Sequence, residues 1–233
     1  MSTALPIYLA MTGLELRACS ERPEHIAWMA CHFSPYTQGL SNIPETLPEN
    51  ALLMVNDRTE PHGHDPASVA QQLIDTVEQF NIRGVVLDFQ RPYNDETQRI
   101  AAEIQSTLLC PVAVTPAYAT AHSGAVFVPP VPPDRHIADH LKPWAGKEIW
   151  LEMENQGICL TVTEDGCAAE ALPELPKEPL FSDIALCCHY GIQVQNDRAV
   201  FSLYRTEDDQ IKLLQKAEDL GVTLAVGLYQ EYR

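Results

Sequence analysis

The sequence predicts an α/β fold, namely a compact, irregular (β/α)₈ barrel of the TIM type with β-hairpins inserted in its C-terminal half. Residues 52–115 read as strand, helix, strand, helix, strand. The strand segments are apolar on both faces, as in a parallel sheet covered by helices. A length of 233 residues lies at the lower end of the range for such barrels, which begins at about 200. We expect a single domain, residues 1–233.

The first strands are predicted by short apolar runs. Residues 6–11 (PIYLAM) and 25–31 (HIAWMAC) predict two buried strands, and the segment between them has room only for a small helix or turn. Residues 52–56 (LLMVN) predict the next strand. Asp65 and Pro66 then supply an N-cap and a first-turn proline for a helix whose apolar positions continue to residue 80.

The middle of the chain repeats this unit. Residues 84–89 (GVVLDF) predict a strand, and Asp95 with Gln98 resembles a capping box before a helix that extends to residue 108. Residues 111–115 (PVAVT) predict the strand that follows. At the end of the chain, Thr206 caps a helix that stops at Gly221, and residues 223–227 form the last strand.

The region between these parts contains more strands than helices. Strand-like runs lie at 149–153, 158–163, 183–188 and 199–204, and the segments 155–157 (NQG) and 196–197 (ND) have hairpin-turn composition. We therefore expect local antiparallel hairpins here. The predicted barrel strands lie near residues 7, 26, 52, 84, 112, 149, 184 and 223, with Ala125–Val128 as a competing strand. A doubly wound open sheet is the alternative fold.

Composition limits the partners and the compartment. With 15 Lys and Arg against 32 Asp and Glu, the formal net charge is −17, so we expect neither a nucleic acid nor a membrane as partner. No apolar run of about 18 residues exists, and the N-terminal segment lacks signal-peptide features. The seven cysteines include no CxxC pair, which is typical of free thiols. Together these features predict a cytoplasmic protein.

Asp88 is the first candidate for a functional residue. In an extended strand, Val86, Asp88 and Gln90 project to one face. A carboxylate at the end of an apolar strand needs hydrogen bonds or a wet cavity, and in barrels the chemistry lies at the C-terminal ends of the strands. The alternative is that Asp88 caps a turn or pairs with Arg91.

The segment GVVLDFQ (84–90) resembles the fourth-strand motif of glycoside hydrolase family 18, the chitinase-like barrels, in which a glycine-led strand ends in DxxDxDxE. In this alignment Val86 takes the place of the middle aspartate, Asp88 that of the last aspartate, and Gln90 that of the acid glutamate. The resemblance implies that Asp88 orients a substrate N-acetyl group. Because Gln90 has no proton to transfer, it also implies a carbohydrate-binding or cell-wall-fragment-binding protein whose catalysis is lost or rerouted.

Other residues could complete such a site. Glu152 and Glu154 share a strand face with Trp150, which would place two carboxylates beside an aromatic ring; the alternative is an exposed hairpin face. We therefore list Asp88, Gln90, Glu152 and Glu154 as catalytic candidates, and Asn56, Asp57, Arg91, Tyr118, Trp150, Tyr190, Tyr229 and Glu231 as substrate-binding candidates. Such a polar and aromatic cavity suits a small saccharide or a related neutral ligand.

Two other functions remain open. His62 and His64 (PHGHD, 61–65) follow a strand, so a metal-dependent barrel hydrolase is one alternative. A non-catalytic acidic scaffold is the other. The motifs GxSxG, GxGxxG and GxxxxGK[ST] are absent, which removes serine hydrolases, Rossmann oxidoreductases and P-loop nucleotidases as leading ideas, and we expect no cofactor.

Overall fold

The computed structural model describes residues 5–155, 157–174, 181–195 and 197–232. Its internal contacts form two compact units. One unit consists of Pro6–Pro129, Gly146–Glu152 and the described residues from Val222 onward, and the other consists of Pro130–Ala145 and Met153–Gly221. That the whole chain acts as one domain stays a prediction.

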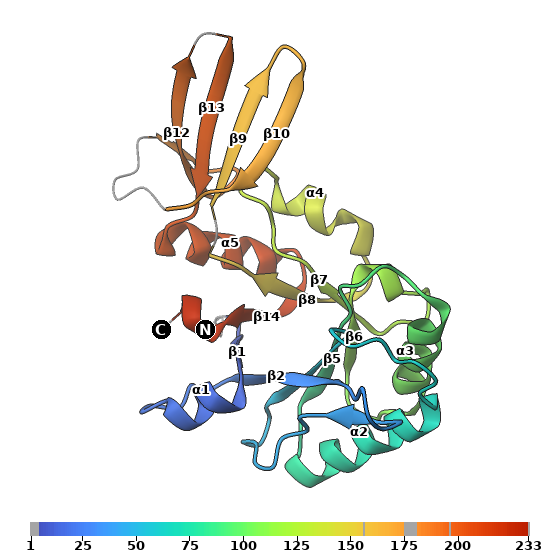
Figure 1. Cartoon of the computed structure of the whole chain (residues 1–233). Coiled ribbons are helices and arrows are strands. Elements are labelled where there is room, and N and C mark those ends of the chain that lie inside the picture. The colour runs from blue at the N-terminus through green and yellow to red at the C-terminus, as the bar shows by residue number, and fades with distance from the viewer. Residues whose placement is uncertain (1–4, 156, 175–180, 196, 233) are drawn as a thin grey trace. The chain divides into compact units, whose positions relative to one another are not determined.

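The first unit contains a closed ring of parallel strands (Figure 1). The ring follows the order β1-β14-β8-β7-β6-β5-β4-β2, and the pairing of β1 with β2 closes it. This confirms the predicted (β/α)₈ barrel. Its strands are β1 (Ile7–Met11), β2 (Ile26–Phe33), β4 (Leu52–Asn56), β5 (Gly84–Asp88), β6 (Val112–Val114), β7 (Ala125–Val128), β8 (Glu148–Met153) and β14 (Val222–Leu228), and β3 (Leu40–Ser41) pairs antiparallel with β2.

One barrel strand was assigned wrongly from sequence. Ala125–Val128, the competing candidate, is β7 and is buried at all four positions. Residues 183–188 are not a barrel strand. The Asp183 carboxylate accepts hydrogen bonds from the backbone N–H groups of Ala185 and Leu186, at 2.8 and 3.0 Å. This turn interrupts the apolar run, because an Asp side chain competes with strand pairing for nearby backbone groups.

The helices follow the expected signals with one shift. In the first unit they are α1 (Gly13–Ala18), α2 (Pro66–Phe80), α3 (Asp95–Thr107), η1 (Pro116–Tyr118) and η3 (Tyr229–Glu231), and in the second α4 (Ile137–Leu141), η2 (Lys142–Trp144) and α5 (Glu207–Asp219). Asp65 caps α2 as predicted. Helix α3, however, is capped by Asn94, whose side chain accepts from the N–H of Thr97 at 2.8 Å, and not by Asp95. Among the described residues, no helix is long and apolar enough to cross a lipid bilayer.

The barrel interior combines small and large side chains. Alanines at positions 10, 27, 113 and 125 leave room for the rings of Tyr8, Phe127 and Trp150. Trp150 packs against Gly84 at the start of β5, where an added Cβ would lie 2.6 Å from the indole. Such interdigitation makes the lower barrel a packed core, and any ligand must therefore bind above it, at the C-terminal ends of the strands.

The second unit contains a five-stranded antiparallel sheet of order β10-β9-β13-β12-β11. Its strands are β9 (Ile158–Thr163), β10 (Gly166–Ala171), β11 (Phe181–Asp183), β12 (Cys188–Gln195) and β13 (Arg198–Tyr204). The hairpin predicted at 196–197 is confirmed, since Gln195 pairs with Arg198. A second hairpin, in which Thr163 pairs with Gly166, was not predicted. The NQG segment does not join two paired strands, because β9 pairs with β10 and β13. Gln156 and Asn196, in the two predicted turns, lie outside the described residues.

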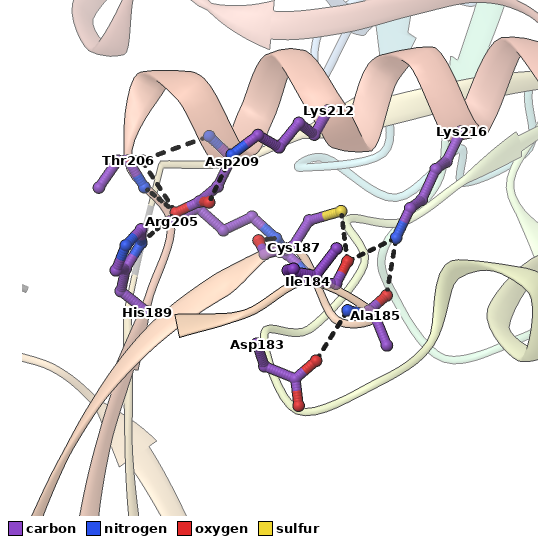
Figure 2. A network of polar contacts seen from close by, with 10 residues as sticks. All are labelled: Asp183, Ile184, Ala185, Cys187, His189, Arg205, Thr206, Asp209, Lys212 and Lys216. Atoms are coloured by element: carbon purple, nitrogen blue, oxygen red, sulfur yellow. Dashed lines mark hydrogen bonds and ion pairs between the residues drawn. The ribbon is translucent and has the colours of Figure 1, made fainter. Parts of the chain in front are cut away.

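A polar network joins the sheet of the second unit to α5 (Figure 2). The buried guanidinium of Arg205 donates to the carbonyls of Cys187, Val131 and Pro132. Asp209 pairs with His189 and accepts from the N–H and hydroxyl of Thr206, which completes the cap of α5. All of these polar groups are occupied by the fold, so the network has a structural role.

Candidate functional site

Asp88 occupies the position that the sequence predicts for it. It is the last residue of β5, and Val86, two residues earlier, belongs to the barrel interior. Gln90 Nε2 donates a hydrogen bond to Asp88 Oδ1 at 2.6 Å. The ion pair with Arg91 that was the alternative is not formed; Arg91 donates to Glu60 at 2.7 Å instead. The carboxylate and the amide therefore form one unit at the C-terminal mouth of the barrel.

The environment favours the neutral form of Asp88. Burial raises the pKa of its carboxyl above the ordinary value of 3.8, the hydrogen bond from Gln90 opposes this shift, and the negative charge of Asp57 adds to it. A group held in this way is suited to hydrogen bonding with a polar ligand, and perturbed carboxyls of this kind are concentrated at functional sites.

The Asp88→Asn variant is expected to be more stable than the wild type at pH 7. Because the folded-state pKa is raised, the folded protein holds the proton more tightly than the unfolded chain, and the free energy of unfolding falls as pH rises from the unfolded pKa through the folded one. The amide removes this cost. Calorimetry should give a higher melting temperature for the variant at pH 7, with the difference shrinking towards pH 4. A lower melting temperature at pH 7 would contradict this assignment.

Asp57 is buried, and its carboxylate holds the backbone that follows β5. Its side chain is only 3% exposed. One oxygen accepts from the N–H of Gln90 at 2.9 Å, and the other from the N–H of Arg91 at 3.0 Å. The carboxylate therefore fixes the backbone that carries Gln90. Both oxygens already accept hydrogen bonds from the backbone, and direct contact of Asp57 with a substrate stays a prediction.

Gln90 and Glu152 line the same pocket. This pocket has a volume of about 240 Å³ and is bounded by Phe89, Gln90, Arg91, Thr115, Pro116, Ala117, Phe127, Pro129 and Glu152. These residues follow β5 and β6 and lie at the ends of β7 and β8, so the pocket opens at the C-terminal face of the barrel. Its volume is below the roughly 300–1,000 Å³ of sites for drug-sized ligands, and it suits one sugar-sized group.

A second pocket adjoins the first, because Arg91 lines both. It has a volume of about 420 Å³ and is also lined by Glu60 and Tyr93. Tyr93 is 54% exposed, and its ring stacks on Tyr118 at a centroid distance of 5.4 Å. Tyr93 was not among the residues selected from sequence, since one tyrosine in a polar loop gives no distinctive pattern. It presents an anchored aromatic ring beside the mouth.

Of three aromatic residues predicted to bind substrate, two are buried in the barrel unit and one belongs to the second unit. Trp150 is 1% exposed and fills the lower barrel. Tyr118 is fully buried and packs against Phe89. Tyr190 lies in β12 of the second unit, where it stacks on Phe181. The alternation of a strand shows which residues share a face, but not how deep each lies along it. The substrate-binding roles of these three residues stay predictions.

The remaining candidates lie near strand ends. Asn56 ends β4, and its Nδ2 donates to the carbonyl of Met29 at 3.2 Å. Glu154 follows β8 and is exposed. Tyr229 and Glu231 are half-buried residues of η3, directly after β14. Direct contact of these four residues with a ligand stays a prediction.

The two histidines of the predicted metal site, His62 and His64, contact protein groups. His64 is buried, and its Nε2 lies 3.1 Å from the carbonyl oxygen of Gly39. His62 is exposed and pairs with Glu60 at 2.8 Å. Within the described part of the chain, no three His, Cys, Asp or Glu side chains come together in a way that could hold a metal ion. The geometry therefore gives no support to the metal-dependent alternative.

Comparison with solved structures places the fold among chitinase-like barrels. No family model and no curated protein matches the sequence. The spore cortex-lytic enzyme SleL of Bacillus cereus is similar with a TM-score of 0.59 at 9% identity, over 99% of this chain and 74% of that one. A chitinase from Chromobacterium violaceum is similar with a TM-score of 0.59 at 8% identity, over 96% and 93% of the two chains.

A third similar structure contains a ligand. It is a family 18 chitinase from Cycas revoluta with one Gly→Trp and one Glu→Gln substitution, in complex with (GlcNAc)₄. The TM-score is 0.50 at 10% identity, over 96% of this chain and 94% of that one. At these identities the similarity concerns the fold, and this chain shares the barrel fold of these chitinases and of the cortex-lytic enzyme.

Proposed function

We propose that this chain is a chitinase-like barrel protein that binds a saccharide of the N-acetylglucosamine or cell-wall type without cleaving it. The observation that carries the proposal is the Asp88–Gln90 pair at the mouth of a barrel with the family 18 fold. In the motif that this segment resembles, the position of Gln90 belongs to the acid glutamate. An amide can donate a hydrogen bond to a glycosidic oxygen, but it cannot protonate it.

The surroundings of the pair support saccharide binding. Asp88 can accept from an amide or hydroxyl of the ligand, and Gln90 and Glu152 offer further polar atoms in the adjoining pocket. Tyr93, anchored on Tyr118, takes the place of the predicted stacking residues. Aromatic rings beside a few convergent polar groups are typical of small-ligand sites. If catalysis is rerouted, Glu152 is the residue that would donate the proton in place of an acid at position 90.

Binding of (GlcNAc)₄ tests this proposal directly. Isothermal titration calorimetry should detect binding by the wild type and about tenfold weaker affinity for Asp88→Ala, because a buried polar group of the ligand that loses its hydrogen-bond partner costs about 1–3 kcal/mol. Asp75→Asn, on the exposed face of α2, makes a similar charge change away from the mouth and should bind normally. No binding by the wild type, or equal binding by Asp88→Ala, would overturn the proposal.

The predicted compartment and partners fit this function. All seven cysteines are free thiols, which supports the predicted cytoplasmic location, and a net charge of −17 disfavours a nucleic-acid partner. In such a compartment, a soluble saccharide or a fragment from cell-wall turnover is an accessible ligand. The pockets at the barrel mouth favour this function over that of a non-catalytic acidic scaffold.

A further inference from the structure

A third pocket lies beside the end of β4, the strand next to β5, and is lined by arginines. It has a volume of about 730 Å³. Its lining comes from α1 and the segment that follows it, from the middle of β2, from the loop after β3 and from the end of β4. Arg17, Arg22 and Arg58 line it, together with a single acidic residue, Glu45. Three guanidinium groups around one pocket are unexpected in a chain with 32 acidic and 15 basic residues.

The three guanidinium groups form no hydrogen bond or ion pair with other described residues. In the described part of the chain, no hydrogen bond or ion pair of these side chains is present, whereas Arg91 and Arg205 are both engaged. Glu15, the acidic residue nearest along α1, uses one oxygen in the cap of that helix and the other to accept from Gln230. The arginines therefore keep their donors available for a ligand.

The pocket is built by an irregularity in the barrel. The pairing of β2 with β4 shifts register between Trp28 and Cys31, and Met29 and Ala30, which lie in this bulge, line the pocket. Asn56 bonds to the Met29 carbonyl, and the Trp28 indole donates to the carbonyl of Asn42 at 2.9 Å. Bulges often occur beside functional sites, where they redirect side chains. Here the bulge and its bonds fix one wall of the pocket.

Two contacts join this pocket to the mouth. Asn56 lines it and pairs in register with Asp88 on the neighbouring strand. Arg58 also lines it, and its carbonyl accepts from the guanidinium of Arg91, the residue shared by the other two pockets. A ligand held at Asp88 is therefore within reach of the arginine-lined pocket.

We propose that this pocket binds the anionic group, a carboxylate or a phosphate, of an acidic saccharide whose sugar ring lies at Asp88. The proposal rests on the proposed function and specifies its ligand class, by adding an anionic group to the saccharide expected from sequence. Guanidinium groups are suited to this task because their forked donors match the oxygens of carboxylates and phosphates. In a protein of net charge −17, such a local positive site also selects anions that the rest of the surface repels.

Matched sugars test the proposal. N-acetylmuramic acid differs from N-acetylglucosamine by a carboxylate-bearing substituent, and N-acetylglucosamine 6-phosphate differs from it by a phosphate. Titration calorimetry of the wild type should show at least one of the two acidic sugars binding about tenfold or more tightly than the neutral one, the value of one charge-assisted hydrogen bond. The preferred acidic sugar identifies the anion. Equal affinity for all three sugars would overturn the proposal.

Charge-removing variants separate this proposal from the proposed function. The triple variant Arg17→Gln, Arg22→Gln, Arg58→Gln should lose the preference for the acidic sugar and bind (GlcNAc)₄ as the wild type does. Arg99→Gln, an exposed arginine on α3, should keep the preference. A preference that survives in the triple variant would overturn the arginine-lined site. If the preference depends on the arginines but Asp88→Ala leaves all binding unchanged, the anion site stands and the proposed function fails.

Discussion

The Gln90→Glu variant is expected to gain hydrolysis of (GlcNAc)₄, at a rate about 10²–10⁴-fold above the background measured with the non-cleaving wild type, which is the usual contribution of a general acid. The Gln90 amide lies 2.6 Å from Asp88 Oδ1, so the introduced carboxyl would stand next to a carboxyl whose pKa is already raised. Two carboxyls at this distance titrate as a pair, and the charge of one raises the pKa of the other, which favours a protonated acid in the pair. Chromatography of the products measures the rate.

Two further variants, Gln90→Asn and Glu152→Gln, show whether an acid at position 90 accounts for any cleavage. Gln90→Asn shortens the amide and should remain inactive, because it introduces no acid. If the wild type itself cleaves the sugar and Glu152→Gln abolishes cleavage, catalysis is rerouted through Glu152 and is not lost. A Gln90→Glu protein that folds and binds (GlcNAc)₄ but does not cleave it would show that the missing proton is not what separates this chain from an active hydrolase.

Replacing Asp57 by alanine is expected to lower the free energy of unfolding by about 2–4 kcal/mol, because two backbone N–H groups lose their buried acceptor. At this chain length the loss corresponds to roughly 5–15 °C in melting temperature. Saccharide binding should weaken as well, since Asp57 fixes the backbone of Gln90. Thermal unfolding and calorimetry measure the two effects.

Asp57→Asn is the matched control for this variant. It keeps one acceptor oxygen, so its loss of stability should be smaller than that of Asp57→Ala. Because the negative charge of Asp57 contributes to the raised pKa of Asp88, the pKa of Asp88 should fall in Asp57→Asn, as an NMR titration can follow. A melting temperature of Asp57→Ala equal to that of the wild type would show that these two hydrogen bonds do not hold the loop.

Most of the helices and strands of this fold can be predicted from local sequence patterns. The βαβαβ unit was predictable because its strands are short apolar runs and its helix caps are explicit, as at Asp65. The residues 183–188 were misassigned because their composition is as apolar as that of a barrel strand. The Asp183 turn that interrupts them depends on local hydrogen bonds that hydropathy does not record.

The part of the site that depends on one strand was predictable from the sequence, and the part that depends on several strands was not. The position of Asp88 follows from the alternation of β5, and the adjacent Gln90 follows from the same strand. The depth of Trp150 depends on Gly84, a residue of a different strand. The arginine-lined pocket brings together Arg17, Arg22 and Arg58 from three segments, and its wall depends on a register shift in β2. Such long-range features have no signature in a single sequence.

A crystal structure of the wild-type protein grown with (GlcNAc)₄ tests the central claim most directly. The account predicts an uncleaved saccharide at the C-terminal mouth, with one sugar ring hydrogen-bonded to the side chains of Asp88 and Gln90. A saccharide bound away from these two residues, a mouth left empty at saturating sugar, or a cleaved product at the site would contradict it.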